Sequence, residues 1–320
     1  MNDISGKITS LRTARGEAQV SCSAATIARI QAGDLPKGNF FDTARAAGLL
    51  AAKQTQHLLP HCHPVPIDGF QIDFEIQPAG DFSNTTETTD SAFGDARGWV
   101  RIVAEGRSVS RTGIEMEVLT ALSVTALTMY DMLKPVDAQL EIGGIRLLGK
   151  TGGRTQQRAN QPAGLRAAVL VASDRAATGE TEDRSGPLAA EMLRARDVIV
   201  EEIRVVPDEA DAIRGALQGW LDAGLDFIFT SGGTGLGPRD RTVDVVRELI
   251  QKDAPGIAEA MRSFGQDRTA FAMLSRSVAG SAGRSLIVTL PGSPGGVRES
   301  LQAILPGVLH ARAMLAGDGH

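Results

Sequence analysis

The stretch LDFIFTSGGTGLGPRDRTVDVV, residues 225–246, decides the fold of the second half of the chain. It opens with an apolar run typical of a buried strand, passes through a loop with four glycines, and ends in a helical pattern. Glycines allow backbone N–H groups to approach an anion closely, and the helix that follows contributes its positive N-terminal end. Strand, glycine loop and helix in this order indicate an α/β domain with an anion site.

The segments around this stretch alternate between strand and helix patterns. We predict strands over 167–173, 198–206, 225–231 and 285–290, and helices over 186–196, 209–224, 241–252 and 297–315. Apolar strands separated by helices predict a mostly parallel sheet covered on both faces. In such sheets ligands bind beyond the carboxyl ends of the strands.

Polar and glycine-rich segments fall where these strands end. They are VASDRAATGETEDRSGP (171–187), VVPDE (205–209) with Asp208, and LPGSPGG (290–296) with Ser293. Ordinary turn chemistry explains each segment taken singly, but parallel strands bring all of them to one edge of the sheet. Asp240 either caps the helix that follows the glycine loop or holds Mg²⁺ against phosphates. The loop is not a Walker loop, because the GK[ST] ending is missing.

A polar stretch, KTGGRTQQRANQPAG at 150–164, separates this alternating part from the rest. Glycine, glutamine, asparagine and proline dominate it, as expected of a solvated linker. We therefore predict a first domain over 1–153, a linker over 154–164 and a second domain over 165–320. A length of 320 residues suits two domains of ordinary size.

The first domain mixes helix and strand patterns without strict alternation. Helices are expected over 42–56 and 118–134, and strands over 70–78, 99–106 and 141–149. This mixture predicts an α+β layer.

The overall composition excludes several classes of protein. With 42% hydrophobic and 22% charged residues the chain is globular, and its net charge of −5 gives no global attraction to nucleic acid or to anionic membranes. Cys22 and Cys62 are too few for a disulfide framework, and the opening MNDISGK lacks the features of a signal peptide. We expect no apolar stretch that approaches the ~20 residues needed to span a bilayer. We expect a cytoplasmic protein.

Three histidines fall close together in HLLPHCHPVP, at 57, 61 and 63, with Cys62 between the last two. Imidazole and thiolate are natural zinc ligands, but Pro60 interrupts a helix that would align His57 with His61, and no second ligand pair follows. We favour a catalytic or phosphate-contacting histidine over a metal site. A turn that merely happens to contain histidines stays open as an alternative.

The segment GIEMEVLTALSVTALTMYDMLK, residues 113–134, carries acidic groups near both ends. Asp131 and Lys134 share a helix face at i,i+3 spacing, which suits either a proton-relay pair or a surface ion pair. Glu117 lies fourteen residues before Asp131, about 21 Å away along a helix. The two ends therefore serve separate sites, or a neighbouring subunit brings them together in an oligomer with interfacial sites.

At these positions the chain resembles a known family. LPKGNFFDTARAAGLLAAKQT, LLPHCHPVPI, GIEMEVLTALSVTALTMYDMLKPVD and LLGKTGG resemble the MoaC family, the cyclic pyranopterin monophosphate synthases of molybdenum cofactor biosynthesis, over residues 1–153. The resemblance implies a ferredoxin-like α+β fold and a homo-hexamer, a trimer of dimers, with active sites between subunits. It also implies conversion of a cyclic dihydroguanosine triphosphate, derived from GTP, into cyclic pyranopterin monophosphate and pyrophosphate. It assigns no cofactor to this domain with certainty.

The resemblance carries residue roles onto matching positions. It implies catalytic roles for Lys37, His63, Asp131 and Lys134, and substrate-binding roles for Cys62, Glu115, Met116, Glu117 and Lys150. Only six of the 33 basic residues are lysines, and three of the six fall on this pattern. The chain departs from the family at Asn39, His61 and the KTGGRT segment, which affects substrate affinity more than the reaction.

The second domain resembles another family of the same pathway. SDRAATGETEDRSGP, VVPDE, TSGGTGLGPRD, PGIAEAMRSFG, AMLSR and LPGSP resemble the MogA/MoaB family of molybdopterin adenylyltransferases and their relatives. The resemblance implies a three-layer αβα fold, commonly trimeric, that transfers an adenylyl group from Mg·ATP to molybdopterin. It implies catalytic roles for Asp208 and Asp240, with Mg²⁺ on Asp240, and ligand-binding roles for Ser231, Gly232, Gly233, Thr234, Gly235 and Ser293.

Together these patterns predict a bifunctional enzyme that acts on two pterin-pathway substrates, with ATP and Mg²⁺ needed in the second domain. One alternative keeps the second domain as a non-catalytic pterin-binding or oligomerising module. Another makes the first domain a nucleotide-binding regulator.

Overall fold

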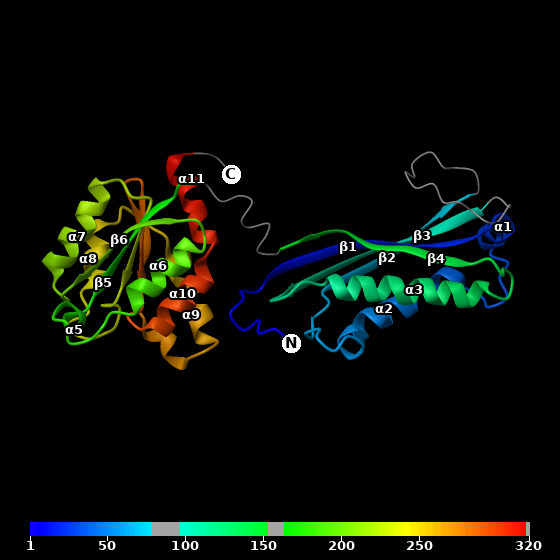
Figure 1. The fold of residues 1–320 in the computed structure, drawn as a ribbon, viewed down its shortest axis with the longest axis horizontal. Coiled ribbons are helices and arrows are strands. Elements are labelled where there is room, and N and C mark those ends of the chain that lie inside the picture. The colour runs from blue at the N-terminus through cyan, green and yellow to red at the C-terminus, as the bar shows by residue number, and fades with distance from the viewer. Residues whose placement is uncertain (79–96, 153–162, 318–320) are drawn as a thin grey trace. The chain divides into compact units, whose positions relative to one another are not determined.

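The structure is a computed structural model that describes residues 1–78, 97–152 and 163–317. The chain divides into two compact units, one formed mainly by Thr9–Gln156 and the other by Gln157–His320 (Figure 1). The predicted linker over 154–164 lies outside the described residues apart from its last two positions.

The N-terminal unit is a four-stranded antiparallel sheet with two long helices on one face (Figure 1). Its elements are β1 (Ser10–Ser23), α1 (Ala24–Ala32), α2 (Phe40–Leu58), β2 (Gly69–Gln77), β3 (Arg97–Ser110), α3 (Glu115–Leu133) and β4 (Glu141–Thr151). The strand order is β2-β3-β1-β4, and every neighbouring pair is antiparallel. β3 thus lies between β1 and β2, which is the ferredoxin-like arrangement. The predicted α+β fold is confirmed.

Small residues let the helices of this unit pack closely. A Cβ atom added to Gly16 of β1 would lie 2.9 Å from Cδ1 of Leu122 in α3. One added to Gly48 of α2 would lie 2.1 Å from Oγ1 of Thr125 in α3. Neither contact leaves room for a side chain, so glycine is required where α3 meets β1 and where α3 meets α2.

The sequence pattern missed β1 and α1 and set several ends too far in. β1 reads SLRTARGEAQVSCS, and its alanines, arginines and glycine have little β preference, yet it is a central strand. α2 begins at Phe40 because the side chain of Asn39 accepts a hydrogen bond from the backbone N–H of Asp42. The other predicted elements of this unit are confirmed, with ends displaced by up to four residues.

α3 is long and apolar enough to cross a membrane. A stretch of 18 residues within it has a mean hydropathy of 1.2, and half of that stretch is buried inside the protein. The expectation that no apolar stretch approaches this length is therefore wrong for α3. Its buried residues, among them Val118, Leu122 and Met129, belong to the core of the N-terminal unit. α3 has the length and composition of a membrane-spanning helix because it packs in the core against the sheet.

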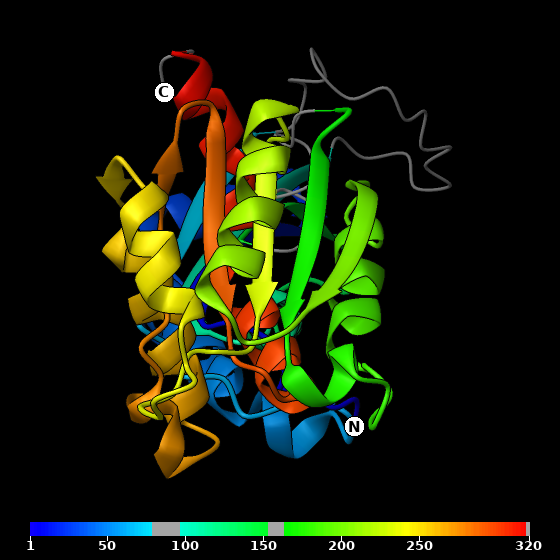
Figure 2. The ribbon, with the colours of Figure 1, turned by 90° about the vertical axis from the view of Figure 1, so that its left-hand side faces the viewer.

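The C-terminal unit is a six-stranded sheet in the order β6-β5-β7-β10-β9-β8. The strands are β5 (Arg166–Ala172), β6 (Ile199–Val206), β7 (Phe227–Ser231), β8 (Lys252–Asp253), β9 (Ala279–Ala282) and β10 (Ser285–Leu290). β6, β5, β7 and β10 run parallel (Figure 2). β9 pairs antiparallel with β10, and the short β8 pairs antiparallel with β9. The predicted mostly parallel sheet is confirmed, but the sequence analysis did not predict β8 and β9 or their antiparallel pairing.

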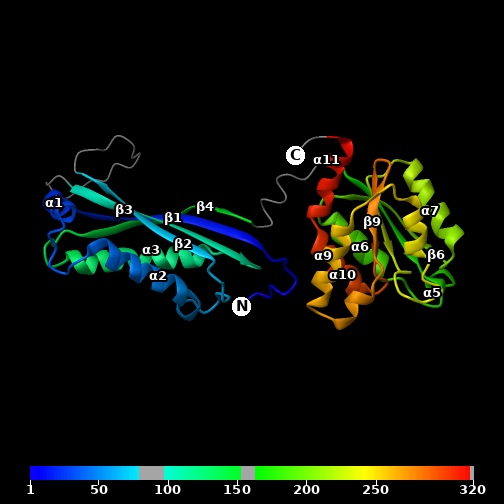
Figure 3. The ribbon, with the colours of Figure 1, turned by 180° about the vertical axis from the view of Figure 1, so that it is seen from behind.

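Helices cover both faces of this sheet. They are α5 (Asp174–Ala177), α6 (Ser185–Arg194), α7 (Ala210–Asp222), α8 (Thr242–Leu249), α9 (Pro255–Gln266), α10 (Pro294–Ile304) and α11 (Ala311–Ala316), with short 3-10 segments η1 (Ala270–Leu274) and η2 (Gly307–His310). Figure 3 shows α9 and α10 on one side of the sheet and α7 on the other. In β5, Ala167 and Val169 join the core beneath α6, α9 and α10, whereas Ala168 and Leu170 join the core beneath α7 and α8. Alternation along a wholly apolar strand therefore fills both cores.

One predicted helix of this unit is wrong. The segment 297–315 is not continuous but divides into α10, η2 and α11. Pro306 stands between the first two, where a proline interrupts the helical hydrogen bonds. The sequence pattern also did not identify α9 as an element.

Candidate functional site

The first group of predicted residues gathers at the C-terminal end of α3. Lys37, in the loop before α2, donates from Nζ to Oδ2 of Asp131 at 2.6 Å and to the Asp131 carbonyl at 2.8 Å. Lys134 approaches Oδ1 of the same carboxylate at 2.7 Å, which confirms the i,i+3 pair. Hydrogen bonds from Lys134 and then Lys37 lower the pKa of Asp131 to about 2, and Asp131 in turn raises the pKa of Lys134.

The second group lies at the N-terminal end of α3. Lys150 of β4 donates to Oε1 of Glu115 at 2.8 Å. Burial opposes ionisation of Glu115, but hydrogen bonds from Lys150 and its own backbone N–H, together with the charges of Lys150 and Arg12, outweigh it and lower its pKa. Met116, beside it on the first turn, is exposed.

Glu117 is the buried acid of this second group. It is 4% exposed, and burial raises its pKa; its own backbone N–H opposes that rise, while the charge of Glu115 adds to it. Burial and then the charge of Glu117 raise the pKa of the Cys62 thiol, so Cys62 lies near Glu117. One neighbourhood therefore holds a carboxyl group whose pKa is lowered, Glu115, and one whose pKa is raised, Glu117, together with Lys150 and Cys62.

A continuous helix separates these two groups within one chain. α3 runs without a break from Glu115 to Leu133, so its ends lie roughly 27 Å apart at 1.5 Å per residue. The structure thus brings together Lys37, Asp131 and Lys134, and separately Lys150, Glu115, Glu117 and Cys62, but does not bring the two groups together in one protomer.

His63 belongs to the loop that follows α2. Within residues 1–78, 97–152 and 163–317 it makes no hydrogen bond or ion pair, but it lies near enough to Asp3 to contribute to lowering the pKa of that carboxyl, after hydrogen bonds from Ser5. Among the same residues no group of three or more His, Cys, Asp or Glu side chains is arranged to hold a metal ion.

In the C-terminal unit the predicted residues follow neighbouring parallel strands. β6 lies on one side of β5 in the sheet, and β7, the next strand along the chain, lies on the other side of β5. The carboxyl ends of β5 and β7 therefore flank a topological switch point, where sheets of this kind bind ligands. Gly232 follows β7 with φ +95°, and a Cβ atom there would lie 2.2 Å from the carbonyl oxygen of Ala172 at the end of β5. Gly233 has φ +63°, and its Cβ would lie 2.2 Å from Oγ1 of Thr242. Glycine at both positions therefore keeps this loop tight against the strand ends.

Several hydroxyl groups are buried around this loop. Ser231 is fully buried and donates to the carbonyl of Pro291 at 3.1 Å, which ties the loop after β7 to the loop after β10. Thr234 is buried as well. In the described part of the chain Oγ1 of Thr242 has no hydrogen-bond partner, although it is buried beside Gly233.

Asp240 does not cap α8, contrary to one of the two readings of the sequence. The N-cap residue of α8 is Arg241, which makes no side-chain capping bond. Oδ2 of Asp240 instead accepts from the backbone N–H of Gly237 at 2.8 Å, within the glycine loop. A carboxylate held in this way has its other oxygen available, which fits the one or two carboxylates that Mg²⁺ takes beside substrate phosphates.

Ser293, by contrast, does cap a helix. Its side chain accepts from the backbone N–H of Gly296 at 3.1 Å at the start of α10. The hydroxyl hydrogen of Ser293 is not used in that bond, so the group can still donate to a ligand.

Sequence reasoning missed the partners of Asp208. Burial raises the pKa of Asp208, and its carboxylate accepts from the backbone N–H of Asp174 at 3.1 Å. Arg239 binds Asp174 from the glycine loop. Both residues lie inside motifs of the second domain, SDRAATG and GLGPRD, but no periodicity in the sequence distinguishes them from their neighbours. Arg12, close to Glu115, was missed because β1 itself was not predicted from the sequence.

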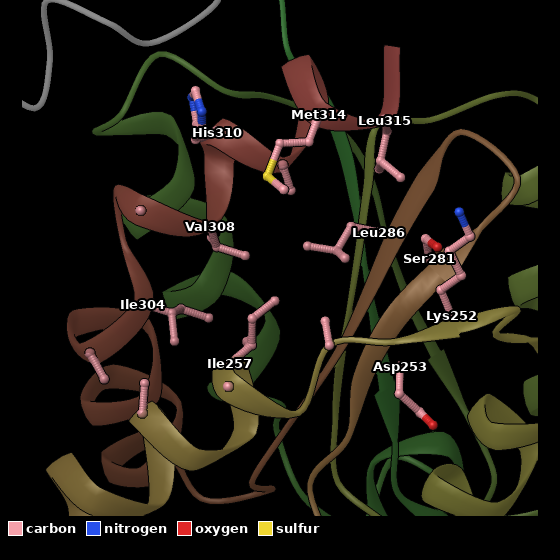
Figure 4. A pocket seen from close by; sticks show the side chains of 16 residues that line it. Lys252, Asp253, Ile257, Ser281, Leu286, Ile304, Val308, His310, Met314 and Leu315 are labelled. Atoms are coloured by element: carbon pink, nitrogen blue, oxygen red, sulfur yellow. The ribbon is translucent and has the colours of Figure 1, made fainter. Parts of the chain in front are cut away.

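A separate cavity of about 450 Å³ lies in the C-terminal unit, near the first residues of β10 (Figure 4). Ile257, Leu286, Ile304, Val308, Met314 and Leu315 are among its apolar lining residues, with Lys252 and His310 among the basic ones. No residue predicted for either site lines it. It opens near the strand start, away from the carboxyl ends where Asp208 and the glycine loop lie.

Comparison with protein families assigns each unit. The MoaC family matches residues 1–153, and a family described as probable molybdopterin binding domain matches residues 168–311. Both resemblances drawn from the sequence are confirmed. A cyclic pyranopterin monophosphate synthase from Roseiflexus sp. is 41% identical over 48% of this chain and 87% of its own length. The solved structure of the molybdopterin biosynthesis enzyme MoaB from Thermus thermophilus is 46% identical, covers 48% of this chain and 97% of its own, and has a TM-score of 0.46.

Two relatives match the whole chain. The molybdenum cofactor biosynthesis bifunctional protein of Chlorobaculum tepidum is 40% identical and that of Synechococcus elongatus is 39% identical; each match covers 100% of this chain and at least 96% of the relative. The two family matches also occur here in one chain and in the same order as the two units. The chain therefore belongs to the family of bifunctional molybdenum cofactor biosynthesis proteins, with a MoaC domain followed by a molybdopterin-binding domain of the MogA and MoaB type.

Proposed function

We propose that the N-terminal domain, residues 1–153, is a cyclic pyranopterin monophosphate synthase whose active sites lie between subunits. Its substrate is a cyclic dihydroguanosine triphosphate, its products are the cyclic monophosphate and pyrophosphate, and the assembly is a hexamer built as a trimer of dimers. The observation that carries the proposal is that ammonium and carboxylate groups pair at both ends of α3. Asp131 lies 2.6 Å from Lys37 and 2.7 Å from Lys134 at one end, and Glu115 lies 2.8 Å from Lys150 at the other. A second copy of the chain completes a pocket that one copy leaves divided.

The chemistry of these groups suits a triphosphorylated purine derivative. Closing the cyclic phosphate forms a bond between a sugar oxygen and the α-phosphorus, breaks the bond to the β-phosphate oxygen, and releases pyrophosphate. Lys37, Lys134 and Lys150 offer positive charge for the phosphates, and His63 joins them in this proposal. Lys134, with its pKa raised by Asp131, stays protonated and is the proposed proton donor. Glu117, whose pKa is raised by burial, is the carboxyl group proposed to exchange a proton with the substrate. In this proposal Glu115, Met116 and Cys62 line the substrate beside it.

Mixing two inactive variants tests the interfacial site. Lys134→Met removes the ammonium at one end of α3, and Lys150→Met removes the one at the other end. Each variant alone is expected to lose activity by about 10²- to 10⁴-fold. When the two are unfolded, mixed and refolded together, half of a random set of dimers is mixed, and each mixed dimer holds one intact site out of two. Roughly a quarter of the wild-type activity is therefore expected to return.

Two controls make this result decisive. Lys53→Met removes an exposed lysine of α2 outside both groups and should leave activity unchanged. Mixing Lys37→Met with Lys134→Met, which affect the same end of α3, should restore nothing, because every mixed dimer then has both sites damaged. No recovery in the Lys134 and Lys150 mixture, with assembly shown by its mass, would mean that the site lies within one protomer.

We further propose that the C-terminal domain, 165–320, joined through the linker 154–164, adenylylates molybdopterin with Mg·ATP. A phosphate oxygen of molybdopterin attacks the α-phosphorus of ATP, the bond between the α-phosphorus and the bridging oxygen breaks, and pyrophosphate leaves. This reading is supported by the residues that follow the carboxyl ends of three parallel strands. They are Asp208, the Ser231–Gly235 loop with Thr234, and Ser293. Mg²⁺ would neutralise phosphate charge when bound, and Asp240 is the residue that we propose would hold it. Backbone N–H groups of Gly232, Gly233 and Gly235 would receive the phosphates.

Adenylylation separates this proposal from a non-catalytic pterin-binding module. The wild-type protein with molybdopterin, ATP and Mg²⁺ should form adenylylated molybdopterin and pyrophosphate. Asp240→Ala should abolish product while molybdopterin binding, followed by calorimetry, persists. Arg247→Ala, on the last turn of α8, serves as the matched control for a charge change nearby. Well-folded wild-type protein that binds molybdopterin without turnover would favour the binding module.

A further inference from the structure

Asp174 and Asp208 fasten the ends of two neighbouring strands to one another. Asp174 begins α5 directly after β5, and Asp208 follows β6. The backbone N–H of Asp174 donates to Oδ2 of Asp208 at 3.1 Å, and the backbone N–H of Asp208 donates to Oδ1 of Asp174 at 2.9 Å. Each residue therefore fixes the other through its carboxylate, a reciprocal arrangement that sets both the backbone and the side chain of Asp208.

Helix capping does not account for the Asp174 carboxylate. The N-cap residue of α5 is Ser173, whose side chain accepts from the backbone N–H of Ala176 at 3.3 Å. Asp174 turns instead toward the loop after β6. The carboxylate thus serves the neighbouring strand rather than its own short helix.

Arg239 reaches this pair from a third strand end. It belongs to the glycine loop after β7, and its guanidinium donates to Oδ2 of Asp174 from Nε at 3.1 Å and from Nη2 at 2.5 Å. Two carboxylates fixed this close repel each other, and the guanidinium offsets that repulsion. β5 lies between β6 and β7 in the sheet. The series of contacts from Arg239 to Asp174 and on to Asp208 therefore crosses the switch point where the nucleotide is expected to bind.

We propose that Asp174 and Arg239 are positioning residues for adenylyl transfer: Arg239 holds the Asp174 carboxylate, and Asp174 holds Asp208 in the geometry that the reaction needs. The inference rests on the proposed adenylyltransferase function. It adds two residues to the reacting aspartates and explains why a loop that binds phosphates also carries an arginine directed away toward β5.

The charges facing Asp208 make the proposal testable by pH. Burial raises the pKa of Asp208, the charges of Asp174 and Asp240 raise it further, and Arg239 lowers it together with the hydrogen bond from the backbone of Asp174. Glu209 acts on Arg239 as well. Removing the Arg239 charge should therefore raise the pKa of Asp208, whereas removing the Asp174 charge should lower it. A residue that only stabilises the fold would not produce shifts of opposite sign.

The experiment compares Arg239→Gln, Asp174→Asn and wild type in the full chain. Molybdopterin adenylylation is followed from pH 5 to 9 with saturating Mg·ATP, and the carboxyl carbon of Asp208 is titrated by ¹³C NMR, its signal assigned with Asp208→Asn. Arg175→Gln is the matched control, since Arg175 adjoins Asp174 but pairs with Glu180. We expect kcat to fall about tenfold to a hundredfold in Arg239→Gln with KM for ATP changed less. The acid limb and the Asp208 titration should both move to higher pH in this variant.

The outcomes distinguish the two proposals. In Asp174→Asn the titration of Asp208 should move to lower pH, and Arg175→Gln should match wild type. Opposite shifts in the two variants, together with a wild-type protein that adenylylates nothing, would support the coupling and refute the adenylyltransferase function. Wild-type activity with unshifted titrations in both variants would overturn the inference, as would a loss of activity matched by an equal loss of thermal stability.

Discussion

Asp131 is the residue whose surroundings most constrain the reaction at the N-terminal site. Two ammonium groups hold its carboxylate, and its pKa of about 2 keeps it ionised at any pH at which the protein would be assayed. It therefore acts as a fixed negative charge that keeps Lys134 protonated. In the proposed mechanism the lysine therefore donates the proton and the aspartate orients the lysine.

Asp131→Asn should shift the alkaline limb of the synthase pH profile to lower pH. The Asp131 carboxylate raises the pKa of Lys134, so removing its charge lets Lys134 lose its proton at lower pH. The measurement is kcat/KM for pyrophosphate release between pH 7 and 11. Asp73→Asn, an exposed position of β2, is the control. An unmoved alkaline limb would show that another group supplies the proton.

Asp137 provides a prediction about stability. Burial opposes ionisation of Asp137, but hydrogen bonds from the backbone N–H of Ser23, the backbone N–H of Gln139 and the hydroxyl of Thr26 outweigh it and lower its pKa. Asp137→Ala leaves those donors unpaired and should reduce the free energy of unfolding by about 1–3 kcal/mol at pH 7.

The pH dependence of that loss follows from the lowered pKa. The stabilising contribution is present above the unfolded value of 3.8 and disappears as pH falls through the lower folded value. The difference between wild type and variant, measured by urea unfolding, should therefore shrink below pH 4. A difference that stays constant from pH 7 to pH 3 would mean that Asp137 acts through packing alone.

At the residue scale, motif patterns located Lys37, Asp131 and Lys134 but not their geometry. The i,i+3 spacing predicted the Asp131–Lys134 pair, and the structure confirms it. The contact from Lys37, ninety-four residues earlier, depends on how the α1–α2 loop meets α3. Asp174 and Arg239 escaped notice because their contacts join loops from different strands, which no local pattern records.

Among the elements, α2 and α3 pack with almost no space between them. A Cβ atom on Gly48 would lie 2.1 Å from Oγ1 of Thr125 and 2.6 Å from Cδ1 of Ile72. Gly48→Ala should therefore lower the free energy of unfolding of the N-terminal unit by about 1–3 kcal/mol through overpacking. Thermal unfolding checks this value.

Gly215 supplies the opposite control. It lies on the exposed side of α7, and a Cβ atom there meets nothing within 4 Å. Gly215→Ala should stabilise the C-terminal unit by about 0.5–1 kcal/mol, because alanine loses less backbone entropy in a helix. Equal effects of the two substitutions would show that the close approach of α2 to α3 does not matter.

Elements with strong periodicity were predictable, and those defined by their neighbours were not. The apolar strands β5, β7 and β10 carry enough β-branched and aromatic residues to identify them. β1 and β9 are rich in small residues, since helices and neighbouring backbone approach them closely, and this removes the usual strand signal. Pro306 was visible in the sequence, but the apolar pattern around it continues and concealed the break between α10 and η2.

At the scale of the whole molecule, the two domains are expected to work independently. Lys134→Met should abolish the synthase reaction and leave molybdopterin adenylylation within twofold of wild type. Asp240→Ala should do the reverse. Both reactions are measured on the same preparations, which controls for folding and concentration. Loss of both activities in either single variant would contradict independence.

The division into two domains was predictable, because a polar stretch separates two different patterns of strands and helices. The assembly remains part of the proposal. Helix length shows that residues at the two ends of α3 do not meet within one chain, so the proposed shared site needs a second copy. The number of copies depends on surfaces whose pattern the sequence does not reveal.

The unbroken course of α3 also limits how this domain can vary. Each residue of an α-helix advances the chain by about 1.5 Å and turns it by about 100°. One inserted residue would leave Glu115 in place but swing Asp131 and Lys134 to another side, away from Lys37. The middle of α3 should thus accept many changes of side chain and no change of length, because the helix length fixes the distance and the relative orientation of the two groups at its ends.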